Sequence, residues 1–459
     1  MPLGGTDTAI YDKFLKEFYL PGWSDLQNNM TTTKKLMRRR TVPFRGRRAI
    51  IALRTGRTGG IQSVAPSQAS GFSGTTPTSA ASTLPSPGFQ QTDNAFIKPK
   101  ILMLAIGVPQ DTIDIASGDR ASFMDVVDFE MMGAKADAAN REDLLCYKGG
   151  AQSASFTGSL GLANIATWTD GTHFTVDNIY PFYKNQRLSF YTAAGAFIAS
   201  STVLSITRST RAIVLDVNGP TATTNAIALT GARPITTTAA NDLYSYEPWG
   251  LEVIVNTANP TLKDLDGNTR YLGIDRSTQD QWQSVLVDCG GAFTYEKAQQ
   301  VLDEIHDNSG GDATVGLTNR TTRRKVALKF HFGTATEAGL TQTRFNDSIR
   351  AKGGLVAYEE DRHGQEAVDW MKLNDEIPII LDRYATHDFV NNKGNIYFLD
   401  TRHWYEAVVV DWKWWAPEGR ILREAMNTNQ FGLQAHAYRF FERVCDAPNA
   451  QGRLYNISA

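Results

Sequence analysis

Apolar residues recur at helical spacing most clearly in the segment 117–143, which predicts a long helix. Ser117 or Asp119 can cap its start by accepting a hydrogen bond from a free backbone N–H. The faces outside the apolar stripe hold seven acids and three bases, a net charge of −4. The stripe consists of Met124, Val127, Met131, Ala134 and Ala138. The acids outside it include Asp125, Asp128, Glu130, Glu142 and Asp143, so we expect a long helix with an acidic outer surface.

A second amphipathic helix is predicted in the sequence "TYEKAQQVLDEIHDNSGG". Thr294 is its expected N-cap, and Gly310 its expected end, because glycine readily adopts the left-handed conformation that closes a helix. Its apolar stripe is Tyr295, Ala298, Leu302 and Ile305. A shorter helix is expected within 6–30, where Ile10, Phe14 and Phe18 recur every four positions before Pro21-Gly22.

Strand-like runs cover much of the remaining chain. Residues 166–236 alternate β-branched and aromatic residues with Gly, Ser, Thr and Asn turns, which predicts a compact all-β insert. The runs "AIIAL" (49–53) and "ILMLAI" (101–106) are predicted to pair as the stems of a long hairpin, with an open edge at Pro99. The last 85 residues mix strands with short helical pieces. In "DWKWWAPEG", Trp412 and Trp414 alternate with Lys413, which favours packing of one strand face over stacking on a sugar or base.

The tip of that hairpin has a distinct composition. Of the 38 residues from 55 to 92, 24 are Gly, Ser, Thr or Pro. A segment with so few large apolar residues cannot build a core that offsets its ordering entropy. It is either a linker or a segment that becomes ordered on another chain.

Charge is distributed unevenly along the sequence. The stretch "KKLMRRRTVPFRGRR" (34–48) has eight bases in fifteen positions and no acid, and 26–92 holds ten bases and no acid. The rest of the chain carries 36 bases against 48 acids, a net charge of −12, although the whole chain has a formal charge of only −2. A basic arm is therefore joined to an acidic body.

Known catalytic and cofactor-binding patterns are absent from the sequence. There is no GxxxxGK[ST] phosphate loop, no GxGxxG after a strand and no HExxH, and no two histidines have helical ligand spacing. We therefore expect no catalytic residue, cofactor or metal. The "DLDGN" segment (264–268) lacks the spacing of a calcium loop and is predicted to be an Asp-Gly turn. Cys146, Cys289 and Cys445 are expected to be plain buried or half-buried thiols.

The sequence shows neither an apolar run of transmembrane length nor the pattern of a signal peptide. We therefore expect no membrane partner. The three cysteines are far apart, odd in number and without a CxxC pair, which fits synthesis in a reducing cytoplasm.

The order of parts, a basic arm and hairpin, a long acidic helix and a mixed body, resembles the major capsid protein of tailed double-stranded DNA phages, the Hong Kong ninety-seven fold. The segments "RYLGIDRSTQDQW" (270–282) and "EIPIILDRYATHDFVNNKGNIYFLDTRHWYEAV" (376–408) are similar to segments of that family. The resemblance implies an α+β fold with an N-arm, an extended loop, a spine helix, peripheral and axial domains and a small all-β insertion. The implied division is 1–43 N-arm, 44–108 extended loop, 109–165 peripheral domain with spine helix 117–143, 166–236 insertion, 237–289 peripheral domain and linker, 290–400 axial domain, and 401–459 return to the peripheral domain.

The same resemblance implies a non-enzymatic structural protein. Its copies would form pentamers and hexamers of an icosahedral head in the virion, assembled in the host cytoplasm. The implied partners are further copies of the chain, a portal protein, scaffolding and decoration proteins, and packaged double-stranded DNA bound non-specifically. The alternatives are an encapsulin-type compartment and a secreted β-rich carbohydrate-active enzyme. Lys98 and Lys100 lie near the loop, but nothing marks a partner for a covalent crosslink.

The basic stretch leads to a specific hypothesis about subunit contacts. Its arginines are predicted to contact the acidic spine helix of the next subunit and to select partner and register, since a single exposed ion pair contributes only roughly 0.2–1 kcal/mol. Two alternatives remain: the arginines are solvated, or they bind packaged DNA. The bases are Arg38, Arg39, Arg40, Arg45, Arg47 and Arg48, and the acids are Asp125, Asp128 and Glu130.

Overall fold

The computed structural model describes residues 31–42, 44, 48–57, 89–109, 120–149, 165–170, 172–176, 178–191, 197–216, 226–229, 247–260, 263–331, 371–372, 377–388, 392–416, 421, 423–424 and 432–458. These residues belong to one unit, Thr31–Ala459, which is separate from Met1–Met30. The predicted helix within 6–30 and the low-complexity segment between 58 and 88 lie outside the described residues. No described helix is long and apolar enough to span a bilayer.

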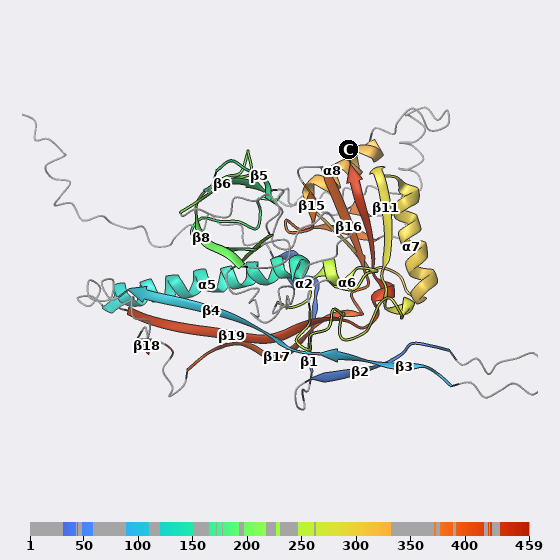
Figure 1. Cartoon of the computed structure of the whole chain (residues 1–459), viewed down its shortest axis with the longest axis horizontal. Helices are drawn as coiled ribbons and strands as arrows, with labels where there is room; N and C mark the ends of the chain where they lie inside the picture. Colours follow the sequence, from blue (N-terminus) through green and yellow to red (C-terminus); the bar gives the residue numbers. More distant parts are fainter. Residues whose placement is uncertain are drawn as a thin grey trace, which may run out of the picture. The chain divides into compact units, whose positions relative to one another are not determined.

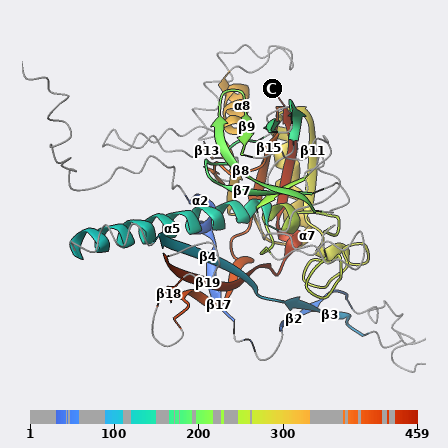
Figure 2. The ribbon, with the colours of Figure 1, turned by 60° about the vertical axis from the view of Figure 1, so that its left-hand side comes forward.

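A five-stranded sheet is built around its longest strand, β19 (Figures 1 and 2). The strand β4 pairs antiparallel with β19 over its whole length, from Lys100↔Phe441 to Pro109↔Gly432. On its other side β19 pairs antiparallel with β17, and β1 adds to β17 as a parallel edge strand. The strands are β1 (Arg38–Thr41), β4 (Lys100–Pro109), β17 (Trp404–Trp414), β18 (Arg423–Glu424) and β19 (Gly432–Cys445).

The predicted pairing of "AIIAL" with "ILMLAI" is wrong. The strand β2 (Ala49–Arg54) pairs instead with β3 (Thr92–Ile97), and β4, which holds "ILMLAI", pairs with β19. Pro99 lies between β3 and β4, where it has no N–H to offer to either ladder. The chain therefore changes pairing partner at Pro99 instead of continuing one hairpin. The ends of β2 and β3 still flank the segment 55–92.

The predicted long helix is α5 (Arg120–Lys148), which ends later than the predicted 117–143; residues 117–119 lie outside the described residues. Near its end α5 contacts α2 (Thr32–Leu36), through Lys34 at Glu142 and Asp143, and β19, through Arg439 at Glu142; α6 (Leu251–Ile254) and β4 also contact the helix. For this reason Glu142 and Asp143, expected on the outer surface, are fully buried, together with Leu144 to Tyr147. Of the predicted stripe, Met131 and Ala134 are half-buried and Ala138 is buried, while the side chains of Met124 and Val127 lie outside the described residues. In the described part of α5, Leu144, Cys146 and Tyr147 near its end belong to the main hydrophobic core.

The expected all-β insert is a six-stranded antiparallel sheet in the order β10-β7-β8-β9-β6-β5. Phe174 and Phe190 form an edge-to-face pair in its interior, with ring centroids 5.9 Å apart. Its strands are β5 (Ile165–Trp168), β6 (His173–Val176), β7 (Arg187–Tyr191), β8 (Phe197–Thr207), β9 (Ala212–Leu215) and β10 (Ala226–Leu229).

A seven-stranded sheet has the order β11-β20-β16-β12-β14-β13, with β15 beside β16. The helix α7 (Tyr295–Ser309) packs against β11 and β20 through its predicted stripe (Figure 1). The final strand β20 inserts between β11 and β16, whereas the preceding strands 404–445 belong to the five-stranded sheet. The elements are α8 (Arg320–His331), β11 (Val285–Ala292), β12 (Val315–Thr318), β13 (Met371–Lys372), β14 (Pro378–Leu381), β15 (His387–Asp388), β16 (Lys393–Leu399), β20 (Gly452–Ser458) and the 3₁₀ turns η1 (Asp280–Trp282) and η3 (Pro448–Ala450).

The local predictions for α7 are confirmed. The Thr294 hydroxyl accepts a hydrogen bond from the Lys297 N–H at 3.4 Å, and Gly310 closes the helix at φ 70°. In β17, Trp412 and Trp414 are half-buried and Lys413 is exposed, as a one-sided strand requires. The three cysteines are free thiols, two buried and one half-buried.

Candidate intersubunit surface

The basic triplet Arg38–Arg40 forms the exposed edge of the five-stranded sheet. β1 pairs in parallel with Tyr405 to Val408, and all four of its residues are exposed. Its outer side has no strand partner among the described residues. An edge strand of this kind presents free N–H and C=O groups to which a strand of another chain can add.

Part of this charge is already matched within the subunit. Arg39 lies 3.4 Å from Asp411 and 4.0 Å from Glu406, both on β17, although more than half of its side chain is exposed. The guanidinium of Arg40 lies over the Tyr405 ring at 5.5 Å. Arg38 forms no ion pair with another described residue. The triplet therefore keeps donors available to a second chain.

Arg48 has a different role at the base of the β2–β3 ribbon. Its guanidinium stacks over Phe96 at 3.9 Å and approaches Asp266 at 3.8 Å. Lys98 also forms an ion pair with Asp266. The predicted Asp-Gly turn is confirmed, with Gly267 at φ 83° and Asp264 Oδ1 accepting two backbone N–H groups. The acids of this turn thus pair with the basic side chains of Arg48 and Lys98. Among the described residues there is no group of candidate metal ligands.

The other predicted contact residues are less fully described. Arg45 and Arg47 lie outside the described residues, as do the side chains of Asp125 and Asp128, whose backbone belongs to α5. Glu130 is exposed on α5 and forms no ion pair with any described residue. Contact between these acids and the arginines of another subunit stays a prediction.

An exposed apolar row lies on β4. The side chains of Ile101 and Met103 are 53% and 61% exposed, and they alternate with the half-buried Leu102. Their cross-strand partners on β19 are Phe440 and Tyr438, whose rings lie 5.3 Å apart. Contiguous exposed apolar side chains of this kind are typical of protein contact sites.

Beneath this surface lies a buried charge network that sequence analysis missed. Arg439 of β19 is fully buried and forms ion pairs with Glu142 at 2.9 Å, Glu406 at 2.8 Å and Asp411 at 3.1 Å. Arg443, also fully buried, donates to the Glu142 backbone carbonyl at 2.8 Å. The network joins α5 to both central strands of the five-stranded sheet.

A second buried pair links β4 to β19. Lys100 Nζ lies 3.2 Å from Glu442, donates to the Glu247 carbonyl at 2.7 Å and sits over the Trp249 ring at 3.8 Å. Burial lowers the pKa of Lys100 and raises the pKa of Glu442, and their mutual attraction opposes both shifts. This lysine is thus held in an ion pair within the subunit.

One sequence signal could have located the two buried arginines of β19. In "YRFFERVC", Arg439 and Arg443 alternate in step with Phe441 and Cys445, which places all four on one strand face. A face shared with Phe and Cys is an inner face, so its arginines require acids from neighbouring elements.

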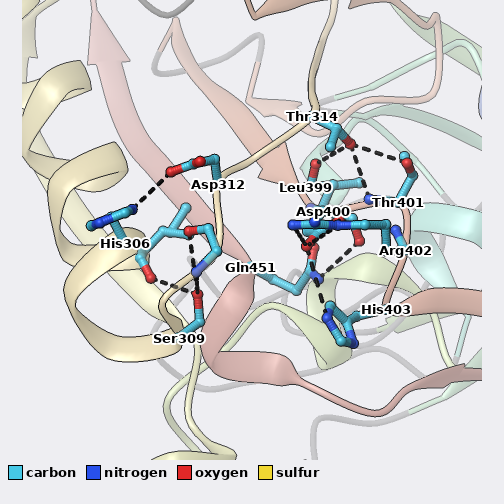
Figure 3. A network of polar contacts seen from close by, with 12 residues as sticks. His306, Ser309, Asp312, Thr314, Leu399, Asp400, Thr401, Arg402, His403 and Gln451 are labelled. Atoms are coloured by element: carbon cyan, nitrogen blue, oxygen red, sulfur yellow. Dashed lines mark hydrogen bonds and ion pairs between the residues drawn. The ribbon is translucent and has the colours of Figure 1, made fainter.

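The seven-stranded and five-stranded sheets are joined by a polar network at the turn between β16 and β17 (Figure 3). The buried Asp400 accepts from the Arg402 side chain at 2.8 Å and exchanges two backbone hydrogen bonds with the Gln451 side-chain amide. His403 pairs with Asp446 at 2.8 Å, which ties this turn to the turn between β19 and β20. The strands that pass from one sheet to the other are thereby fixed side by side.

The whole chain can now be compared with known structures. It is similar to the chain in the capsid asymmetric unit of Cyanophage A-1(L), with a TM-score of 0.53 at 10% identity, covering 99% of this chain and 100% of that one. Its similarity to the capsid of the native GTA particle has a TM-score of 0.45 at 9% identity and covers 100% of both chains. Its similarity to the holo-SrpI encapsulin complex from Synechococcus elongatus PCC 7942 has a TM-score of 0.41 at 9% identity and covers 99% of this chain and 97% of that one. No family model and no curated protein sequence matches it. The first similarity confirms the predicted fold class: the chain has the α+β fold of tailed-phage capsid subunits, the Hong Kong ninety-seven fold.

Proposed function

We propose that this chain is the shell-forming subunit of a phage-type head, and that copies of it assemble into pentamers and hexamers around double-stranded DNA. The observation that carries the proposal is the full-length fold similarity to a chain of a phage capsid. A non-enzymatic role is consistent with the lack of catalytic patterns in the sequence.

The exposed features of the subunit would supply the contacts of such a shell. The free edge of β1 offers backbone pairing, and Ile101 and Met103 offer apolar area. Arg38 and Arg40 would select the acidic spine helix of the next copy through Asp125, Asp128 and Glu130. Because a closed shell lets each subunit touch several neighbours, individually weak contacts are sufficient. Portal, scaffolding and decoration proteins would bind the same shell in the virion, which would form in the host cytoplasm.

Expression of the chain followed by electron microscopy tests the proposal directly. Closed particles support it, whereas a monomer of 50.6 kDa in size-exclusion chromatography contradicts it and favours the enzyme alternative. Particles with genome-sized nucleic acid indicate a phage-type head, and particles lacking it indicate an encapsulin-type compartment.

The charge hypothesis has its own test. Replacing Arg38 and Arg40 with Glu leaves the internal ion pairs of Arg39 intact, so a folded subunit is expected that fails to assemble. Reversal of Asp125 and Asp128 to Arg should then partly restore assembly. Normal assembly of the Arg38→Glu/Arg40→Glu variant would favour solvated arginines. The DNA alternative predicts that the chain binds DNA and that a plot of log affinity against log salt concentration is linear. Its slope should be about −0.9 for each phosphate that the arginines neutralise.

A further inference from the structure

Two buried carboxyl groups from different elements meet where α2 docks onto the body of the subunit. Asp143 lies near the end of α5, Asp382 directly follows β14, and their exposures are 0% and 2%. Each accepts a hydrogen bond from an α2 backbone N–H: Lys34 to Asp143 at 2.8 Å and Thr33 to Asp382 at 3.1 Å. The pair of acids therefore connects α2 to the long helix and to the seven-stranded sheet.

Side-chain contacts strengthen this docking. The Thr33 hydroxyl donates to Asp382 at 2.5 Å and also contacts the Tyr147 hydroxyl at 2.6 Å. Lys34 forms an ion pair with Glu142, whose carboxylate also accepts from Trp412. Thr33 itself is fully buried. The contacts at this short helix are thus concentrated on Thr33 and Lys34.

The two carboxyl groups differ in their donors: Asp382 accepts from the Thr33 N–H, the Thr33 hydroxyl and the Tyr384 N–H, whereas Asp143 accepts from the Lys34 N–H. No N–H or hydroxyl of the described part of the chain donates to the buried Oδ2 of Asp143. Burial and the neighbouring Asp382 raise the pKa of Asp143 to about 8, while the Lys34 N–H and Arg443 act in the opposite direction. One proton shared between the carboxyls turns their repulsion into a hydrogen bond. The titratable and charged groups around them are Lys34 on α2, Glu142, Cys146 and Tyr147 on α5, Tyr384 after β14, Glu406 on β17 and Arg443 on β19.

We propose that Asp143 and Asp382 form a proton-dependent latch for the root of the N-terminal segment. With one shared proton, the pair holds Thr33 and Lys34 on the body. When that proton leaves to solvent, the two carboxylates repel each other and α2 is released. The latch acts within one chain and does not depend on shell formation.

The direction of the pH effect follows from proton counting. In the released state Asp143 titrates at its ordinary pKa of about 4. Between about pH 4 and pH 8 the docked state therefore holds one proton more than the released state. Docking is fully stable below this window and is lost as the pH rises through it. The opening equilibrium should increase about tenfold per pH unit and become level above about pH 8.

Amide hydrogen exchange of the purified full-length chain measures this opening directly, since Thr33 and Lys34 donate the amide protons in question. After correction for the intrinsic pH dependence of exchange, their protection factors should fall about tenfold per unit between about pH 5 and pH 7.5. The Asp143→Asn variant should give a flat profile, because an amide can accept from Lys34 and donate to Asp382 without titrating. Glu130→Gln, which changes an exposed acid on the same helix, should keep the wild-type slope.

Two results would overturn the latch: a flat wild-type profile, or the wild-type slope retained in Asp143→Asn. If Asp143→Asn does not fold, Asp382→Asn replaces it with the same expectation, and the wild-type profile is decisive by itself.

Discussion

Arg439 and Glu406 form an ion pair of 2.8 Å across adjacent strands, and neither side chain is more than 1% exposed. The same carboxylate is approached from the edge strand by Arg39, at 4.0 Å and with 54% of that side chain exposed. The buried Glu406 therefore pairs with one buried base, Arg439, and with one exposed base, Arg39. The two bases differ chiefly in their access to water.

Replacement of Arg439 with Met should lower the free energy of unfolding by about 3–5 kcal/mol, because it leaves buried acids without their counter-charge. Urea denaturation of the unassembled subunit measures the loss. Arg39→Met is the matched control and should cost no more than about 0.2–1 kcal/mol, since the Arg39 side chain and its nearer partner Asp411 are both exposed. Equal losses in the two variants would mean that burial does not control the strength of this network.

Two glycines should respond oppositely to alanine. Gly310 closes α7 at φ 70°, where a side chain is strained, so Gly310→Ala should destabilise the subunit by about 1 kcal/mol. Gly133 lies inside α5 with no heavy atom within 4 Å of an added Cβ. Gly133→Ala should therefore stabilise by about 0.5–1 kcal/mol. Thermal unfolding of both variants tests this, and a shift of both in one direction would contradict the conformational explanation.

Close packing of α7 on β20 makes Gly452 sensitive to an added methyl group. A Cβ there would lie 2.6 Å from Val301 and 2.7 Å from Ile305. Gly452→Ala should cost about 1–3 kcal/mol through overpacking. Gly107 on β4 provides the control, because its nearest neighbour would be 3.9 Å away. The comparison fails if Gly107→Ala is as destabilising in chemical denaturation as Gly452→Ala.

His306 at the end of α7 should titrate above its ordinary range. A hydrogen bond of 2.9 Å and the charge of Asp312 raise the pKa of His306 (Figure 3). The contribution of this pair to stability is therefore present at low pH and is lost as the pH rises through the raised value. NMR titration of the histidine ring protons should show a lower pKa in Asp312→Asn. An unchanged titration would exclude Asp312 as the cause.

The exposure of the basic triplet could be predicted from its composition, but its location could not. Arg38 to Arg40 form a parallel strand with residues more than 360 positions later, and Arg39 finds its acids there. Nothing in the local pattern of "RRRT" specifies that partner. The same holds for Asp143 and Asp382, which lie far apart in the sequence and accept hydrogen bonds from neighbouring residues of α2.

The sequence by itself determined features whose causes lie within a few residues. The cap and end of α7, the Asp-Gly turn at Asp264 and the one-sided burial of Trp412 and Trp414 depend on neighbouring backbone groups, so local residue types were sufficient. The order of arm, hairpin, long helix and mixed body also indicated the fold class. Only the tertiary structure decided which strands pair and which charges are buried. The choice of β19 as partner for β4, the insertion of β20 between β11 and β16 and the enclosure of Glu142 and Arg439 each result from competition among distant segments for hydrogen bonds and for space in the core. Local periodicity cannot resolve that competition, because it is the same whichever partner is chosen.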